Sequence, residues 1–168
     1  MIPLVSIIMG STSDYEVMEK AAKFLDEHDI PFEINALSAH RTADKVSEFA
    51  KNAQKRGVRV IIAAAGMAAA LPGAVAAETT LPVIGVPIKS SFEGLDSVLS
   101  MIQMPPGIPV ATVAVNGSMN AAVLAMEILA LTDETIKDKM QVYKSSLKDK
   151  IIKANEQLKE KQFKNRVF

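Results

Sequence analysis

The sequence predicts a three-layer α/β/α fold with a doubly wound parallel sheet. Five short apolar segments alternate along the chain with segments whose apolar residues recur every three or four positions. Strands that are buried on both faces of a parallel sheet have this continuous apolar character, and helical crossovers between them cover both faces. The expected strands are residues 4–9, 31–37, 58–65, 82–88 and 110–115.

Boundary signals mark several of the expected helices. Ser13 and Glu16 have the spacing of a capping box at the start of the first helix. Thr42 is expected to cap the second helix, and Gly57 to end it in a left-handed conformation. Three further helices are expected: an alanine-rich helix that ends at residue 77, then residues 95–103 and 120–131.

The last part of the chain, residues 132–168, predicts one long amphipathic helix. Apolar residues recur there every three or four positions among charged ones, at Ile136, Met140, Tyr143, Leu147, Ile151, Ala154 and Leu158. A helix that extends beyond the core exposes such a stripe unless another subunit covers it. We therefore expect this helix to pack on a neighbouring subunit of a homo-oligomer.

Composition and charge exclude several classes of protein. The chain has 168 residues and is 49% hydrophobic, which suits one compact domain overall. Its 19 basic and 19 acidic residues cancel, and its lack of cysteine excludes disulfides and thiolate ligands. No apolar run is long enough to span a bilayer, and the amino terminus lacks the basic start of a signal peptide. We expect a cytoplasmic protein that binds neither nucleic acid nor a membrane.

Three loops are expected to meet at the carboxyl edge of the sheet, where open α/β sheets bind ligands. They are residues 10–14, 38–42 and 65–73. Hydroxyl groups, free amides at helix starts and one guanidinium give these loops the composition of a phosphate site, through Ser11, Ser13, Ser38 and Arg41. Asp14 would repel a phosphate and is assigned to ribose hydroxyls. The alternative is that the hydroxyls only cap helices and the guanidinium is a surface charge.

His40 is the candidate proton-transfer group. It lies between an expected strand and an expected helix, and an imidazole both gives and takes protons near neutrality. The alternative is a histidine that only hydrogen-bonds its own loop. His28, at a helix end, is expected to be solvated, and two distant histidines give no metal signature. The loop at 10–14 lacks the glycine spacing and the lysine of dinucleotide and ATP loops.

Five motifs together resemble the catalytic subunit of phosphoribosylaminoimidazole carboxylase, the PurE family. They are Met9-Gly10-Ser11-Thr12-Ser13-Asp14, Ser38-Ala39-His40-Arg41-Thr42, Leu71-Pro72-Gly73, Pro82-Val83-Ile84-Gly85-Val86-Pro87 and Gln103-Met104-Pro105. The resemblance implies a flavodoxin-like catalytic domain over residues 1–131, a role in purine biosynthesis, and no metal or organic cofactor. It also implies a homo-octamer, which is the bacterial form of the family.

The family contains two reactions. Mutases move the carboxylate of N5-carboxyaminoimidazole ribonucleotide from nitrogen to ring carbon C4, whereas a second class carboxylates aminoimidazole ribonucleotide directly with carbon dioxide. Arg41 is similar to the mutases, since the direct carboxylases typically have lysine there, and the Leu71-Pro72-Gly73 turn also favours the mutase. From another class, a non-catalytic phosphate-binding module on the same scaffold remains an alternative.

The resemblance also implies roles for individual residues. His40 would take the C4 proton and return one to the amine. The substrate-binding residues would be Ser11, Ser13, Asp14, Ser38, Arg41, Gly66, Met67 and Ala68, and the residues of the carbon dioxide pocket Ala65, Ala70, Leu71 and Pro72. Mutases usually have glycine at the position of Met67 and histidine at that of Ala70. We expect these departures to affect substrate affinity and rate more than the fold, provided that the backbone torsions at Met67 are ordinary.

Overall fold

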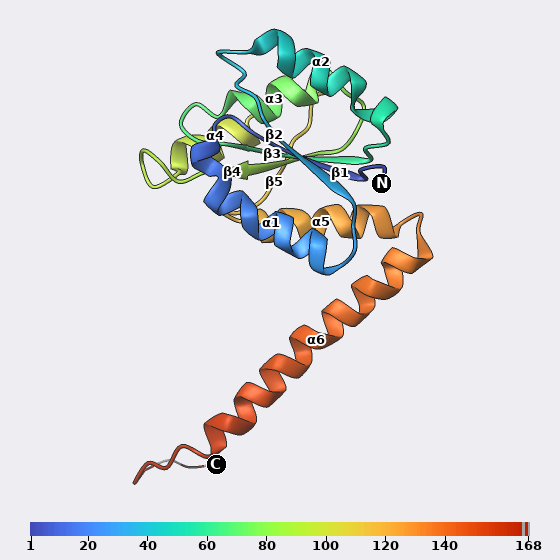
Figure 1. Ribbon diagram of the computed structural model, residues 1–168. Helices are drawn as coiled ribbons and strands as arrows, with labels where there is room; N and C mark the ends of the chain where they lie inside the picture. The colour runs from blue at the N-terminus through green and yellow to red at the C-terminus, as the bar shows by residue number, and fades with distance from the viewer. Residues whose placement is uncertain (166, 168) are drawn as a thin grey trace.

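A five-stranded parallel sheet lies between two layers of helices in the computed structural model, which describes residues 1–165 and 167 (Figure 1). The strands are β1 (Val5–Met9), β2 (Phe32–Ala36), β3 (Val60–Ala65), β4 (Val83–Pro87) and β5 (Ala111–Thr112). Their order is β2-β1-β3-β4-β5, and every neighbouring pair is parallel. This is the flavodoxin-like, doubly wound arrangement that the sequence predicted, with its switch point between β1 and β3.

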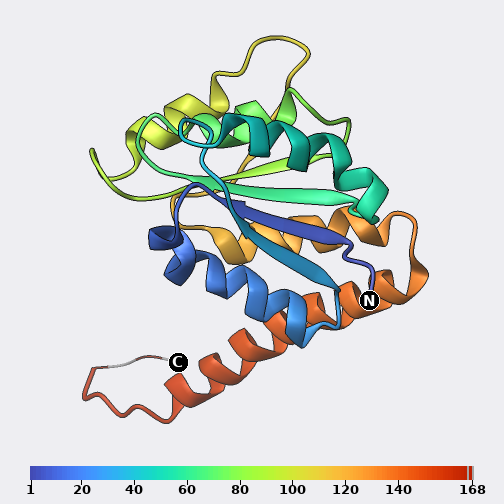
Figure 2. The same ribbon diagram turned by 45° about the horizontal axis from the view of Figure 1, so that its top comes forward.

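The helices divide between the two faces of the sheet. The first face is covered by α1 (Tyr15–Glu27) and α5 (Ser118–Ala130), and the second by α2 (Ala43–Ala53), α3 (Ala70–Ala76) and α4 (Leu95–Ile102) (Figure 2). Successive strand residues point to opposite faces, so Ile7 packs with α1 and α5 while Ile8 packs with α2 and α3. No helix formed by the described residues is both long and apolar enough to cross a membrane.

Several local expectations are corrected by the structure. Strand β5 is two residues long instead of the predicted six, because only Ala111 and Thr112 pair with β4. The predicted capping box is wrong: Asp14 occupies the N-cap position of α1, and the amide of Ser13 donates to the Ser11 hydroxyl instead. Thr42 is at the N-cap of α2, but its hydroxyl bonds Ser38. The left-handed Gly57 is confirmed, with φ of 96°.

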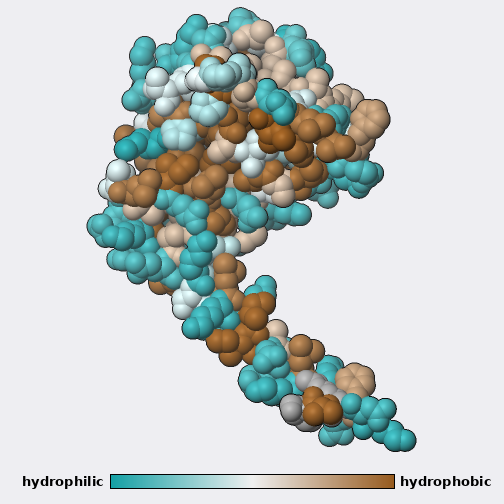
Figure 3. All heavy atoms as spheres, turned by 180° about the vertical axis from the view of Figure 1, so that it is seen from behind, coloured by the Kyte–Doolittle hydropathy of each residue, from teal (hydrophilic) through white to brown (hydrophobic). Residues whose placement is uncertain are grey.

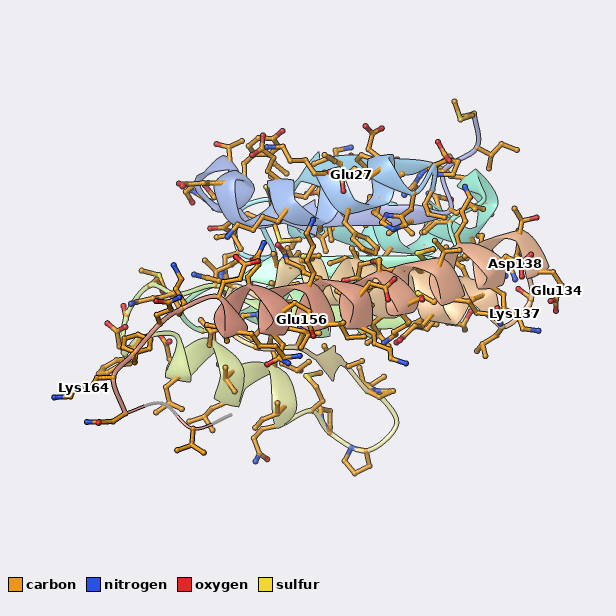
Figure 4. The ribbon with its side chains drawn as sticks, turned by 90° about the horizontal axis from the view of Figure 1, so that it is seen from below. Glu27, Glu134, Lys137, Asp138, Glu156 and Lys164 are labelled. Atoms are coloured by element: carbon orange, nitrogen blue, oxygen red, sulfur yellow. The ribbon has the colours of Figure 1, made fainter. Side chains whose placement is uncertain are left out.

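Helix α6 (Glu134–Lys159) begins against the body and then projects away from it (Figure 1). In its first turns Ile136 and Met140 are buried in the core formed with α1 and α5. The ammonium of Lys139 donates to the His28 carbonyl at 2.8 Å and to the Asp29 carboxylate at 3.0 Å, which fastens α6 to the end of α1. Figure 4 shows α6 from below, with Glu134, Lys137 and Asp138 at its beginning.

The outer half of α6 carries an uncovered apolar stripe. Leu147, Ile151 and Leu158 are 42%, 71% and 56% exposed. Figure 3 shows hydrophobic side chains recurring along this helix between hydrophilic ones. The helix ends at Lys159, so the predicted helix over 132–168 is too long at its carboxyl end. Residues 166 and 168 of that prediction lie outside the described residues.

His28 is half-buried, which corrects the expectation of a solvated side chain. Its ring stacks on Phe24 with 4.2 Å between centroids, and Tyr143 of α6 meets its edge at 5.5 Å. Its Nδ1 atom lies 2.7 Å from the Phe24 carbonyl oxygen. The sequence around His28 did not indicate this burial because the covering side chain comes from α6, more than a hundred residues away.

A polar network joins β1, β2 and the 3-10 turn Gln54–Arg56 that follows α2. The fully buried Ser6 hydroxyl donates to Oε1 of Glu33 at 2.8 Å. The Arg56 guanidinium donates to the same oxygen at 2.9 Å and 3.3 Å and to the Phe49 carbonyl at 3.2 Å. Glu33 is therefore the shared acceptor on which both donors depend.

Glu33→Ala is expected to lower the free energy of unfolding by about 1 to 3 kcal/mol, since the buried Ser6 hydroxyl loses its acceptor. Glu48→Ala is the matched control, because the Lys45–Glu48 pair is exposed and its loss should change stability by less than about 0.5 kcal/mol. Urea denaturation of both variants measures the difference. Equal effects would show that the network contributes no more than a surface ion pair.

Candidate functional site

A cavity of about 480 Å³ opens at the carboxyl edge of the sheet. Its walls come from the loops that follow β1, β2, β3 and β4. The lining residues are Gly10, Ser11, Ser13, Asp14, Glu16, Val17, Ser38, Ala39, His40, Arg41, Ala65, Gly66, Met67, Ala69, Ala70, Leu71, Ile88, Lys89 and Ser90. The three loops that the sequence pointed to are thus brought together, and a fourth joins them.

Two of the predicted site residues do not line this cavity. Ala68 is exposed on the β3–α3 loop, and Pro72 is buried in the first turn of α3. The sequence interpretation missed Lys89 and Ser90, which follow β4. The signal that could have found them was available, because the expected fourth strand ends at the same edge of the sheet as the other three.

The β2–α2 loop is closed by reciprocal hydrogen bonds between Ser38 and Thr42. The amide and the hydroxyl of Thr42 both donate to the Ser38 carbonyl, at 2.9 Å and 3.0 Å, and the Ser38 amide donates to the Thr42 hydroxyl at 2.9 Å. His40 lies on the turn that these bonds close, and its side chain lines the cavity. Thr42 therefore orients the site rather than capping its helix.

The Arg41 guanidinium connects two loops of the site. It makes long hydrogen bonds to the Ser38 hydroxyl and to the Gly10 carbonyl, both at 3.4 Å. The Arg41 amide also donates to the Ser38 hydroxyl at 3.2 Å. The side chain remains exposed, so its other donors are available to an anion in the cavity.

The ring of His40 has no hydrogen-bond partner within residues 1–165 and 167. The alternative interpretation, in which it only hydrogen-bonds its own loop, therefore has no contact in this part of the chain to support it. Both ring nitrogens are available to a molecule in the cavity, and an imidazole with a free nitrogen can accept or donate a proton.

Asp14 places a carboxyl group in the cavity wall. Burial raises the pKa of Asp14 above its ordinary value of 3.8, and the hydrogen bond from the Ser13 hydroxyl, 3.2 Å long, partly opposes this. A half-buried carboxylate that is not used to cap α1 is an acceptor for hydroxyl groups. Within the described residues, no group of three or more His, Asp or Glu side chains is placed to hold a metal ion.

The β3–α3 loop is strained. Met67 and Ala69 have φ angles of 55° and 41°, a left-handed conformation that costs a residue other than glycine about 1 to 2 kcal/mol. The torsions at Met67 are thus not ordinary. The expectation that methionine in place of glycine affects the fold little depended on ordinary torsions, so that condition is not met. The loop is also tightly held: the Met67 amide donates to the Ser90 hydroxyl at 3.2 Å, and a Cβ on Gly66 would lie 3.1 Å from the same hydroxyl oxygen.

The two sides of the cavity differ in chemistry. The β1 and β2 loops supply hydroxyls, the Asp14 carboxyl, the His40 imidazole and the Arg41 guanidinium, whereas the wall from β3 and α3 is mainly alanine and leucine. Such a cavity can bind an anion and hydroxyl groups on one side and exclude water on the other. The His40 imidazole, which can accept or donate a proton, lies on its polar side.

Comparisons with known proteins match this chain over most of its length. The model of the family described as AIR carboxylase matches residues 4–150. An N5-carboxyaminoimidazole ribonucleotide mutase from Pyrococcus horikoshii is 54% identical, covering 94% of this chain and 90% of the relative, and one from Bacillus subtilis is 50% identical, covering 93% and 98%. The crystal structure of Treponema denticola PurE aligns with a TM-score of 0.85 at 38% identity, covering 94% of this chain and 99% of that chain.

Asp14→Asn is expected to stabilise the folded chain at about pH 7 and to have no such effect below the ordinary carboxyl pKa of 3.8. Because the pKa of Asp14 is raised on folding, the folded chain binds more protons than the unfolded chain between the two values. The wild-type chain therefore loses stability as the pH rises through that window, and the amide removes this loss.

Denaturation curves at several pH values measure the effect. The exposed Asp44, in the first turn of α2, is the matched control: Asp44→Asn removes a favourable contact with the helix dipole and should destabilise slightly. Destabilisation by Asp14→Asn at neutral pH would contradict the account of its burial.

Proposed function

The chain belongs to the AIR carboxylase family, and we propose that it converts N5-carboxyaminoimidazole ribonucleotide into 4-carboxy-5-aminoimidazole ribonucleotide in purine biosynthesis. The observation that carries the proposal is the meeting of His40, Arg41 and Asp14 on one cavity at the switch point of the sheet. The relatives from Pyrococcus horikoshii and Bacillus subtilis, 54% and 50% identical to this chain, carry the mutase name.

We assign the polar side of the cavity to the ribonucleotide. The phosphate is held by the hydroxyls of Ser11, Ser13 and Ser38 and by the Arg41 guanidinium, through charge-assisted hydrogen bonds. The Asp14 carboxylate accepts hydrogen bonds from ribose hydroxyls. The imidazole of the substrate then lies toward His40 and the apolar wall.

The reaction requires one proton to leave and one to arrive. The N–C bond of the carbamate breaks with its electrons left on nitrogen, which frees carbon dioxide, and the nitrogen takes a proton from His40. Ring carbon C4 then attacks carbon dioxide, and His40 takes the proton that C4 loses, so the histidine ends in its starting state. Holding both fragments together makes the second step unimolecular, a gain that reaches about 7 to 11 kcal/mol for ideal alignment.

Direct carboxylation of aminoimidazole ribonucleotide is the second candidate reaction, and Arg41 favours the mutase over it. The guanidinium reaches the Ser38 hydroxyl and the Gly10 carbonyl at once, from different nitrogens. A lysine ammonium is a compact point charge and lacks the two separate nitrogens that make these contacts.

The proposal includes a homo-oligomer, an octamer by resemblance to the bacterial family, in which α6 packs on a neighbouring subunit. The exposed stripe of Leu147, Ile151 and Leu158 supports it, since an isolated subunit leaves this apolar surface in water. We place the enzyme in the cytoplasm, with which the absence of cysteine is compatible.

Fresh N5-carboxyaminoimidazole ribonucleotide, mixed with the protein without added bicarbonate, tests the reaction directly. The C4-carboxylated product is expected to form, at a rate above that of the mixture without protein. Product formation only from aminoimidazole ribonucleotide plus bicarbonate would favour direct carboxylation. Binding of the ribonucleotide without either conversion would indicate a binding module.

His40→Asn is expected to keep the fold and substrate binding and to lower kcat by about two to four orders of magnitude, since an amide cannot transfer the protons. Titration calorimetry measures binding, and the conversion assay measures kcat. His28→Asn is the matched control, because His28 lies outside the cavity and its loss should affect stability alone. Substantial turnover by His40→Asn would defeat the assignment.

Ile151→Glu is expected to reduce the mass of the particle in solution, because a carboxylate on the α6 stripe would be buried at the subunit contact. Ser145→Glu adds the same charge to an exposed polar position of α6 outside the stripe, and should leave the mass unchanged. Light scattering during gel filtration gives both masses. An Ile151→Glu protein with the wild-type mass would remove α6 from the proposed interface.

A further inference from the structure

Met67 stands apart from the other apolar residues on the cavity wall. Its side chain is 62% exposed, whereas Leu71 and Ile88 of the same wall are buried in the core. Within the described residues it is the one large apolar side chain that both lines the cavity and is exposed. The Met67 side chain therefore contributes little to the packing of the core.

The backbone conformation at residue 67 is another reason why a gain in stability does not account for methionine at this position. Met67 has a φ of 55°, a conformation in which glycine is free of strain and methionine is not. A strained residue that is not part of the core is a candidate for a role at the site it lines. We therefore look for a contact between the Met67 side chain and a molecule bound in the cavity.

The loop holds Met67 in a defined place. Its amide donates to the Ser90 hydroxyl at 3.2 Å, and the Ala69 amide donates to the Gly66 carbonyl at 3.0 Å across the turn. The backbone is thus attached to the β4–α4 loop on one side and to α3 on the other. What remains free is the unbranched thioether chain, which adapts to the shape of what it covers.

We propose that the Met67 side chain covers the occupied cavity and keeps the freed carbon dioxide beside C4 until the new bond forms. This inference rests on the proposed mutase reaction. Once the N–C bond has broken, carbon dioxide has no charge that Arg41 or a helix amide could hold. Confinement by apolar walls is the means that this cavity offers, and the exposed Met67 lies where that wall meets solvent.

Three substitutions separate the side chain from the backbone. Met67→Gly removes both the side chain and the strain, Met67→Ala removes the thioether chain but keeps the strained conformation, and Met67→Leu keeps an apolar side chain of similar volume. None removes a hydrogen bond, since the bonding group of Met67 is its amide. Unfolding temperatures report whether each variant is folded.

The readout is the fate of the carboxylate carbon. Substrate that carries an isotopic label in its carboxylate is converted in buffer with unlabelled bicarbonate, and mass spectrometry gives the labelled fraction of the C4-carboxylated product. This fraction measures how often carbon dioxide escapes and is replaced before the new bond forms, and it does not depend on the amount of active enzyme.

The wild-type protein and Met67→Leu are expected to retain the label. Met67→Gly and Met67→Ala are expected to give a several-fold larger unlabelled fraction and to release free aminoimidazole ribonucleotide, without a fall in unfolding temperature for the glycine variant. Equal retention in all four proteins would overturn the inference while leaving the mutase proposal intact. A change confined to Met67→Gly would also overturn it, because loop flexibility would then be the cause. Absence of product with the wild-type protein would instead contradict the proposed mutase function.

Discussion

The pairing of β1 with β3 is the constraint on which the site depends. Val5 to Met9 lie beside Val60 to Ala64 in a parallel register, so both strands end at the same edge. The loops that carry Asp14 and Met67 therefore start one strand apart, although more than fifty residues separate them in the chain. The chain leaves β1 toward β2 on one side and later returns to β3 on the other, which opens the space between their loops.

The polar network that stabilises the fold and the residues of the cavity lie in different parts of the molecule. Away from the cavity, the buried Ser6 hydroxyl and the Arg56 guanidinium share the Glu33 carboxylate, so the polar groups there are satisfied. At the cavity, burial raises the pKa of Asp14, the His40 ring is left without a partner in the described chain, and Met67 adopts a glycine-like conformation. The burial of Asp14 and the backbone conformation of Met67 cost stability, and all three features leave a group able to act on a ligand.

The order of strands and helices could be predicted because each element has a local signal. Continuous apolar runs marked β1 and β3, and Gly57 marked the end of the second helix. Three of the four site loops followed from the rule that ligands bind at strand carboxyl ends. Two features could not be predicted. The Thr42 hydroxyl bonds Ser38 within its own loop instead of capping its helix, and Tyr143, from the distant helix α6, covers His28. The left-handed torsion at Met67 was also hidden, since methionine gives no signal for it.

The two departures from the usual mutase loop are best understood together with this geometry. Met67 and Ala70 line the same cavity, so one position has gained volume and the other has lost it. The Met67 amide is held by the Ser90 hydroxyl through a bond that does not involve the methionine side chain. The polar groups assigned to the ribonucleotide come from the β1 and β2 loops and are untouched by either change. The departures therefore act on the apolar side of the cavity, where the chemistry depends on shape and on the exclusion of water.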